Sequence, residues 1–253
     1  MRLARPRTLA TTTALFALLG TGSPAAHSPA HEHAPTPVLA PIAEHHHDSS
    51  LMYGTSSNWS GYAATGGKFT SVSAEWDQPA VTCTDTNTYS AFWVGLDGDG
   101  SKSVEQIGTE ADCSRGTPSY SSWYEMYPAY PVNFRNLVSP GDHFVASVST
   151  NGNGSFTLTI RNTTAGWSHS VAKSLKNAAL ASAEVIAEAP STVSGVLPLA
   201  DFGTVGFANA SVNGKDLGAS NPSVIDMATN KVTKATTSAI SNGTDFSVTW
   251  HHS

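Results

Sequence analysis

The sequence predicts an all-β protein, an antiparallel β-sandwich or barrel, and three observations carry this prediction. Apolar and polar residues alternate along short runs such as 70–76 and 156–160, and a period of two residues is that of a strand with one buried face. Glycine- and asparagine-rich turn signals separate these runs. Helical spacing is seen only at 171–183, which could equally be a loop. Many short strands with regular turns are typical of sandwiches and barrels.

Each expected strand ends at a turn signal. The run 70–76 follows Gly66-Gly67, and the apolar run 91–96 ends at Asp97-Gly98-Asp99-Gly100. Glycine and asparagine favour the left-handed backbone that such turns need. No repeat or linker follows residue 58, so a single domain over residues 51–253 is predicted. The further expected strands are 119–127, 143–149, 184–188, 204–208 and 244–250, with turns at Pro140-Gly141-Asp142, Asn151-Gly152-Asn153-Gly154, Asn213-Gly214 and Asn242-Gly243.

The N-terminus has the pattern of a secretion signal. Three arginines precede the apolar core 9–19, and Ser23-Pro24-Ala25 offers a cleavage site of small residues. The core is too short to span a bilayer, and no later run of about 18 apolar residues exists. We therefore expect residues 1–26 to be a signal peptide, and the mature protein to be extracellular and free of the membrane.

Residues 27–50 are rich in His, Pro and Ala and include the run His45-His46-His47. Such a composition cannot bury a core, so a disordered or pro-segment is expected. Two further interpretations stay open. The histidines could bind a divalent metal ion, or they could make a propeptide pH-sensitive, since imidazoles become charged below about pH 6.5.

The charge of the chain excludes one class of partner. Charged residues make up 13% of the 253 residues, about half of the usual share, and uncharged polar residues take their place. The formal net charge is -6 and no block of Lys or Arg occurs, so nucleic acid is not an expected partner. We expect a monomer.

The two cysteines, Cys83 and Cys113, lie in the part expected to be exported. In an oxidising compartment such a pair is expected to form a disulfide. It would close a loop of about 30 residues, worth about 3–4 kcal/mol in the chain-entropy model.

Carboxylates stand beside aromatic residues on one expected strand. Along 119–127, Ser121, Trp123, Glu125 and Tyr127 share a face. This arrangement suits a groove that binds an extended polymer, but ordinary β-formers on a half-buried strand give the same pattern.

Two further carboxylates, Glu184 and Glu188, point to one side of the strand 184–188. Burial of unpaired carboxylates is costly, so this face is expected to meet either solvent or a polar cleft. Gln106 follows the turn at 97–100, and by itself it has the pattern of a structural residue.

The common hydrolase motifs are absent from the sequence. It has no His-Glu-x-x-His zinc pattern and no Gly-x-Ser-x-Gly elbow, and it lacks paired Asp-Thr-Gly or Asp-Ser-Gly loops. The common hydrolase mechanisms therefore lack their parts.

Several motifs, in order, resemble the eqolisin or glutamic peptidase family, over about residues 58–250. Any one of them is weak, but their order and spacing are compatible with that family. The matching stretches are Asn58-Trp59-Ser60-Gly61-Tyr62, Phe92-Trp93-Val94-Gly95-Leu96-Asp97-Gly98, Glu105-Gln106-Ile107-Gly108, Trp123-Tyr124-Glu125-Met126-Tyr127-Pro128, Ala183-Glu184-Val185-Ile186-Ala187-Glu188 and Ala200-Asp201-Phe202-Gly203.

The resemblance implies a sandwich of two curved antiparallel sheets with the site on the concave face. It also implies an endopeptidase acting on proteins or peptides in acid, without metal or cofactor. Gln106 and Glu188 would be catalytic. The residues that would line or support the cleft are Trp59, Asp97, Glu110, Trp123, Glu125 and Tyr127.

The sequence departs from the family pattern near this expected cleft. Ser121 stands where fungal members carry an acidic residue, Glu110 replaces an aspartate, Val185 replaces a tryptophan, and Ala189-Pro190 replace Asp-Phe. Fewer carboxylates in the cleft indicate a moderately rather than strongly acid optimum.

The pair Gln106 and Glu188 suits acid chemistry on physical grounds. A glutamate, with a reference pKa near 4.3, can be ionised in acid and can serve as a base. A glutamine amide does not titrate and can donate to an oxyanion at any acid pH. Two other readings stay open: a glycoside hydrolase that uses Glu125 and Glu188, and a carbohydrate-binding module.

Overall fold

The computed structural model describes residues 53–192 and 194–253. The expected signal peptide, 1–26, and the histidine-rich segment, 27–50, lie outside these residues. The strands are β1 (Tyr53–Ser56), β2 (Trp59–Thr65), β3 (Ser71–Asp77), β4 (Ala91–Leu96), β5 (Val104–Ser114), β6 (Thr117–Tyr127), β7 (Val132–Asn133), β8 (His143–Thr150), β9 (Ser155–Asn162), β10 (Trp167–Ser174), β11 (Ser182–Glu188), β12 (Ser191–Thr192), β13 (Gly195–Val196), β14 (Thr204–Val212), β15 (Lys215–Asp216), β16 (Ser223–Thr229), β17 (Val232–Thr237) and β18 (Phe246–Trp250), with one 3₁₀ turn, η1 (Leu217–Ser220).

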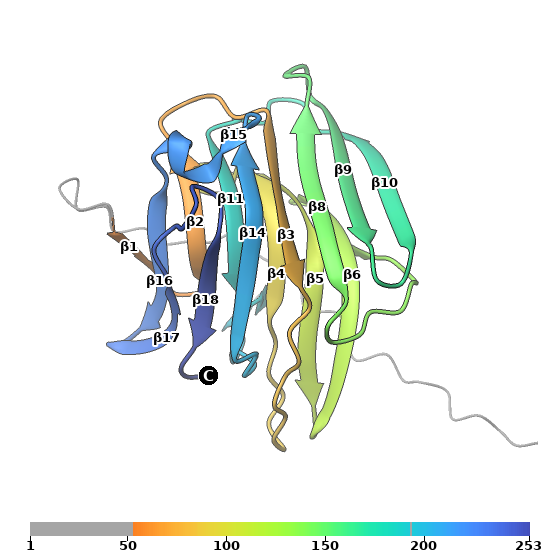
Figure 1. Cartoon of the computed structure of the whole chain (residues 1–253), viewed down its shortest axis with the longest axis vertical. Helices are drawn as coiled ribbons and strands as arrows, with labels where there is room; N and C mark the ends of the chain where they lie inside the picture. The colour runs from red at the N-terminus through yellow and green to blue at the C-terminus, as the bar shows by residue number, and fades with distance from the viewer. Residues whose placement is uncertain (1–52, 193) are drawn as a thin grey trace, which may run out of the picture. The chain divides into compact units, whose positions relative to one another are not determined.

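The strands form two packed layers, which confirms the predicted β-sandwich. Hydrogen bonds connect them along one path, β10-β9-β8-β3-β14-β18-β17-β16-β2-β11-β4-β5-β6-β7, which folds over near β17 and β18. Figure 1 shows β3, β8 and β14 in front of β4, β5 and β11. Strand pairs in the described part of the chain are antiparallel, except that β1 pairs with β16 in parallel.

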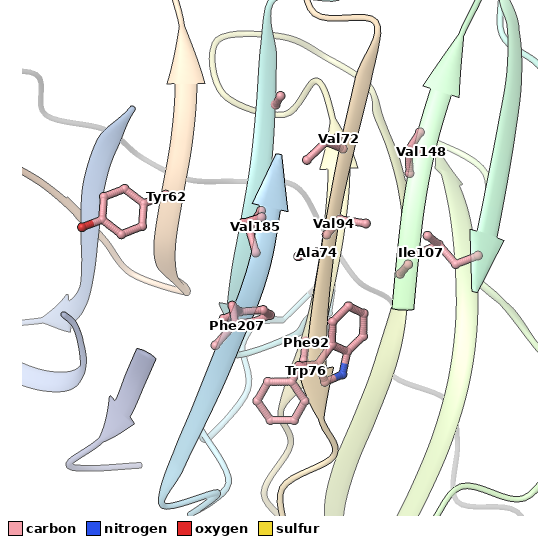
Figure 2. Packing of buried hydrophobic residues seen from close by; sticks show 14 of the residues in the cluster. Tyr62, Val72, Ala74, Trp76, Phe92, Val94, Ile107, Val148, Val185 and Phe207 are labelled. Atoms are coloured by element: carbon pink, nitrogen blue, oxygen red, sulfur yellow. The ribbon is translucent and has the colours of Figure 1, made fainter. Parts of the chain in front are cut away.

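The apolar core lies between the two layers (Figure 2). Phe92 and Val94 of β4 point into it from one layer, and Trp76 of β3 from the other. The Trp76 Nε1 donates a hydrogen bond to the Thr109 Oγ1 of β5 at 3.0 Å, which joins the layers. Burying a large apolar side chain contributes about 1.5–3 kcal/mol, so this core is the main reason why the layers stay together.

Most of the predicted strands are confirmed, but the helical reading of 171–183 is wrong. Residue Val171 pairs with Leu158 as part of β10, and Ser182 begins β11. Between these strands the chain turns through Asn177 (φ 67°) and Leu180 (φ 53°). A right-handed helix cannot include such left-handed residues.

Strand β5 was not predicted from alternation because both of its faces are buried. Ile107 and Ala111 contact the core between the layers, while Val104 belongs to a second apolar cluster on the opposite face. Buried polar residues such as Glu105, Gln106 and Glu110 stand among the apolar ones on both faces, so neither an alternating nor a continuous apolar pattern marks this strand.

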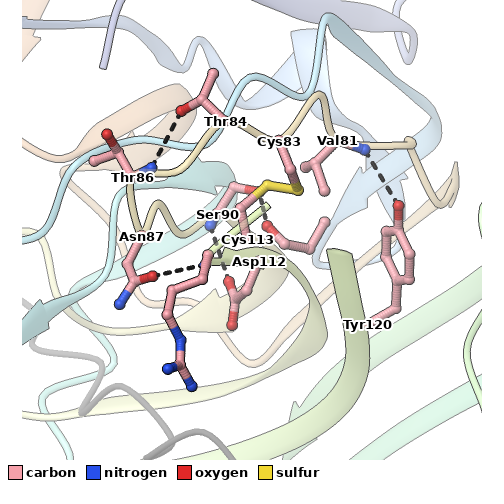
Figure 3. Close-up of a disulfide and its surroundings, with 11 residues drawn as sticks. Val81, Cys83, Thr84, Thr86, Asn87, Ser90, Asp112, Cys113 and Tyr120 are labelled. Atoms are coloured by element: carbon pink, nitrogen blue, oxygen red, sulfur yellow. Dashed lines mark hydrogen bonds between the residues drawn. A yellow bond between two sulfur atoms is a disulfide. The ribbon is translucent and has the colours of Figure 1, made fainter. Parts of the chain in front are cut away.

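The expected disulfide, Cys83–Cys113, is present, with a Cα–Cα distance of 5.4 Å (Figure 3). It ties the loop before β4 to β5, and the same loop is joined to β5 by backbone hydrogen bonds between Thr88 and Cys113. The bridge thus fixes one end of the strand that carries Gln106. Within the described residues, no helix is long and apolar enough to cross a membrane.

Candidate active site

The candidate site lies on the face of β2, β11, β4, β5 and β6 that points away from the other layer, here called the site face. Because side chains alternate along a strand, β4 sends Phe92 and Val94 to the core and Trp93 to the site face. The second apolar cluster occupies this face. Its members are Trp59, Ala63, Ala91, Trp93, Val104, Trp123, Ile186 and Ile225, with Tyr127 packed against it.

Cross-strand register places the polar residues of the site face in rows. Gln106 of β5 is in register with Glu125 of β6, and on its other side with Gly95 of β4, which pairs with Glu184 of β11. Glu188 lies in a different row, which continues through Ala91 to Glu110 and Ser121. Gln106 and Glu188 therefore share the face but not a row.

Glu188 is 1% exposed, and each of its carboxylate oxygens faces a donor. The Trp93 Nε1 donates to Oε2 at 2.8 Å, and the Asn58 Nδ2 donates to Oε1 at 3.2 Å. Burial raises the pKa of Glu188 above its ordinary value, and the charge of Glu125 adds to this, while hydrogen bonds from Trp93, Trp59 and Asn58 oppose it. The donors thus stabilise the ionised carboxylate, whereas burial disfavours its charge.

Gln106 and Glu125 are bonded to each other. The Gln106 Nε2 donates to the Glu125 Oε2 at 2.6 Å, and both side chains are buried. Burial raises the pKa of Glu125 to about 8, against the lowering effect of the Gln106 bond. Glu125 is therefore protonated in acid, and once it ionises its charge raises the pKa of Glu188 further.

Glu110 lies beside the serine that departs from the family pattern. The Ser121 Oγ donates to the Glu110 Oε2 at 3.1 Å. Burial raises the pKa of Glu110 to about 7. Burial also raises the pKa of Asp112, and the charge of Glu110 adds to this effect. A hydroxyl at position 121 thus takes part in a hydrogen bond without adding another charge to the site face.

The structure places Asp97 at a turn beside the strands. Its carboxylate accepts the backbone N–H groups of Leu180, at 2.9 Å, and Ala181, at 2.8 Å. Its φ of 65° is left-handed. Asp97 thus holds the loop that leads into β11 and supports the strand of Glu188 from outside the site face.

The three site-face residues Trp59, Trp123 and Tyr127 supply its aromatic surface. The rings of Trp59 and Trp93 meet edge to face at 5.1 Å. Trp123 is fully buried beside Gly108, and Tyr127 ends β6 in register with Val104. Glu184 and Glu188 are buried among these groups, so the interpretation of a solvated face is wrong.

Glu184 is buried in separate surroundings from Glu188. Burial raises its pKa, hydrogen bonds from Ser182 and from the backbone of Asp99 oppose this, and the charges of Asp99 and Asp97 add to it. Its neighbours therefore belong to the turn after β4. The two glutamates of one strand face have different partners because they lie near opposite ends of β11, Glu184 beside the turn after β4 and Glu188 beside Asn58 at the start of β2.

Some polar atoms of the site face have no hydrogen-bond partner among the described residues. They include the Gln106 Oε1, the Glu125 Oε1 and the Trp123 Nε1, all of them buried. Buried polar atoms are normally paired because an unpaired one costs about 1–3 kcal/mol. These atoms mark where a substrate group or a water molecule can bind. The described residues contain no group of His, Cys, Asp and Glu that could hold a metal ion.

No role for Asn58 or Trp93 followed from the sequence, although both contact Glu188 directly. Both residues occur in the motifs that carry the resemblance, and this was the only signal in the sequence that could have found them. Neither periodicity nor composition marks a buried donor, because its partner is 130 residues away for Asn58 and 95 residues away for Trp93.

Comparison with known proteins gives a consistent result. A model of the peptidase A4 family matches residues 57–250. Aspergillopepsin-2 of Aspergillus niger is 29% identical over 198 residues, which cover 68% of this chain and 70% of that protein. Scytalidopepsin B of Scytalidium lignicola is 33% identical over 123 residues, or 48% of this chain and 45% of that protein.

A solved structure has the same fold. The crystal structure of scytalido-glutamic peptidase with a transition-state analogue inhibitor is 27% identical and superposes with a TM-score of 0.65. The match covers 77% of this chain and 98% of that one.

Proposed function

The chain belongs to the peptidase A4, or eqolisin, family and is a peptide-bond hydrolase, and from this we propose that it is a secreted endopeptidase that works in acid with Glu188 and Gln106 as its catalytic pair. The observation that carries the proposal is the pairing of polar groups on the site face. Glu188 is held between donors, while Gln106 is oriented by Glu125 on the same face.

Glu188 acts as the general base in this proposal. Its ionised carboxylate takes a proton from a water molecule, which attacks the scissile carbonyl carbon, and the acid that results protonates the leaving nitrogen. Trp93 and Asn58 donate to its oxygens and keep it oriented. The proton thus passes from water to the leaving amine through one residue.

Gln106 stabilises the oxyanion. One N–H of its amide donates to Glu125, which fixes the plane of the amide and leaves the second N–H for the carbonyl oxygen of the substrate. A donor fixed in advance pays no reorganisation cost when charge develops, and losing one typically lowers the rate by about 10²–10³.

Glu125 provides the upper limit of the working pH range. Because burial raises the pKa of Glu125 to about 8, it is neutral in acid and its ionisation would place a second charge beside Glu188. The two carboxyls then titrate as a pair with shared macroscopic pKa values. The active form carries one proton on the pair, and activity falls when the pair gains a second proton or loses the first.

The acid limit follows from the surroundings of Glu188. Burial raises its pKa, so the base becomes protonated at a higher pH than an exposed glutamate would. Activity therefore declines on acidification above the ordinary glutamate pKa of about 4.3. This supports a moderately acid optimum.

Residues 1–26 as a signal peptide, and 27–50 as a pro-segment, complete the proposal. The partners are proteins or peptides, one similar structure having been solved with a transition-state analogue inhibitor. We propose that the mature enzyme is a monomer without metal or cofactor.

The test compares Glu188→Gln with the matched control Glu184→Gln, on the same strand and face, in casein hydrolysis across an acid pH series. We expect Glu188→Gln and Gln106→Ala to lose activity while their circular dichroism stays native, and Glu184→Gln to keep most of its activity. Pepstatin and EDTA should not inhibit, and xylan should not be cleaved. Near-normal turnover by Glu188→Gln would overturn the assignment.

A further inference from the structure

We propose that Asn58, oriented by Ser56, is a positioning residue that keeps the carboxylate of Glu188 in its base form; this inference rests on the proposed function. Asn58 is fully buried at the corner between β1 and β2. Its Nδ2 donates to the Glu188 Oε1 at 3.2 Å.

The hydroxyl of Ser56 determines which way the Asn58 amide points. The Ser56 Oγ accepts the backbone N–H of Asn58 at 3.3 Å and that of Trp59 at 3.0 Å. With both lone pairs used, this hydroxyl can only donate its own proton, and the acceptor within reach is the Asn58 Oδ1 at 3.2 Å. The Oδ1 therefore faces Ser56, and the NH₂ group faces Glu188.

The backbone of Asn58 holds the same segment of β11. Its carbonyl oxygen accepts the N–H of Ala189, the residue after Glu188, at 2.8 Å. Asn58 thus contacts both the side chain of Glu188 and the peptide that follows it. Parallel pairing of Ser56 with Met227 of β16 fixes this corner to the sheet.

Both oxygens of Glu188 consequently face groups that only donate. An amide NH₂ and an indole N–H cannot accept a proton, so a protonated Glu188 would lose one of these bonds. The titratable groups on this face are Glu125 of β6, Glu110 and Asp112 of β5, and Glu184 on the same strand as Glu188. Because these neighbours are acidic, the donors are the groups that favour the ionised base.

The experiment measures kcat and KM of the full chain against pH for Asn58→Leu and Asn58→Asp. Asn58→Leu removes the donor at similar volume, so the acid limb of kcat should move up by about one to two pH units, with KM nearly unchanged. Asn58→Asp keeps a donor only while the new carboxyl is protonated. The pH profile of kcat for Asn58→Asp should therefore narrow on its alkaline side, whereas that of Asn58→Leu narrows on its acid side.

The matched control is Asn162→Leu. Asn162 of β9 is also fully buried, and its Nδ2 donates to the carboxylate of Asp142 at 2.7 Å, but it lies in the other layer. Its loss should lower the melting temperature and leave the pH profile where it is.

Glu188→Gln is measured in the same assay, because it distinguishes failure of the proposed function from failure of the role assigned to Asn58. If Glu188→Gln stays active, the proposed function itself fails. If it is inactive while folded Asn58→Leu keeps the wild-type acid limb, only the role of Asn58 is overturned. Loss of the fold in both Asn58 variants would show a purely structural residue and would also overturn the inference.

Discussion

Gln106 and Glu125 stand opposite each other on neighbouring strands, and the Gln106 amide donates to the Glu125 carboxyl at 2.6 Å. The bond orients the Gln106 amide, which does not titrate, through the Glu125 carboxyl, which does. Under the proposed mechanism, ionisation of Glu125 changes the charge beside both Gln106 and Glu188, so the pH dependence of activity should follow the titration of Glu125.

Replacing Glu125 by Gln tests this connection. Glu125→Gln keeps an acceptor for the Gln106 N–H but cannot ionise, so the decline of activity through about pH 8 should disappear. We expect kcat in acid to fall by less than the about 10²-fold that loss of the oxyanion donor itself costs, because the Gln106 amide keeps an acceptor. A pH profile of kcat, restricted to the range where melting curves show a folded enzyme, measures both effects. An unchanged alkaline limb would contradict the prediction.

Stability should fall as the pH rises. Burial raises the pKa of Glu105 from the ordinary value of 4.5 to about 8, and the charge of Asp97 adds to this. The folded protein therefore holds a proton that the unfolded chain has lost, so this contribution is complete below about pH 4.5 and is lost progressively up to about pH 8. Each such group changes the unfolding free energy by about 1.4 kcal/mol per pH unit in that window.

Glu105→Gln checks that statement without touching the site face, since Glu105 pairs with Leu96 on the core side. The slope of the unfolding free energy against pH, from denaturant titrations between about pH 5 and 8, should become shallower by the contribution of one group. Equal slopes for the variant and the wild type would show that Glu105 does not take up a proton on folding.

Close packing at Gly108 should make this position intolerant of a side chain. A Cβ there would meet the carbonyl oxygen of Phe92, and the Cβ of Trp93 at 2.6 Å. We expect Gly108→Ala to cost about 1–3 kcal/mol or more, as overpacking does, and to shift Trp93 away from Glu188. Gly206→Ala on β14 is the matched control, because a Cβ there meets nothing within 4 Å. Equal melting temperatures would contradict the model of this contact.

Removal of the disulfide should destabilise the fold without abolishing it. Cys83→Ala with Cys113→Ala opens the loop at β5, and a loss of about 3–4 kcal/mol should lower the melting temperature by about 6–16 °C. Reductant should affect the wild type and leave the double variant unchanged. If the wild type also ignores reductant, the bridge is not stabilising.

Much of the fold could be predicted from the sequence because it depends on local patterns. Alternation located β3, β8 and β9, and glycine turns located their ends, since a strand with one buried face repeats every two residues. Alternation did not locate β5, which is buried on both faces, and over 171–183 the end of β10, a loop and the start of β11 together imitate a helical spacing.

The sequence by itself determined which residues share a strand face, and through its ordered motifs it identified the family. Only the tertiary structure decided which of these groups meet. Glu184 and Glu188 are equivalent by alternation, yet one lies near Asp99 and the other accepts bonds from Trp93 and Asn58. The physical reason is that alternation is a property of one strand, whereas hydrogen-bond partners depend on the register of strands distant in the chain.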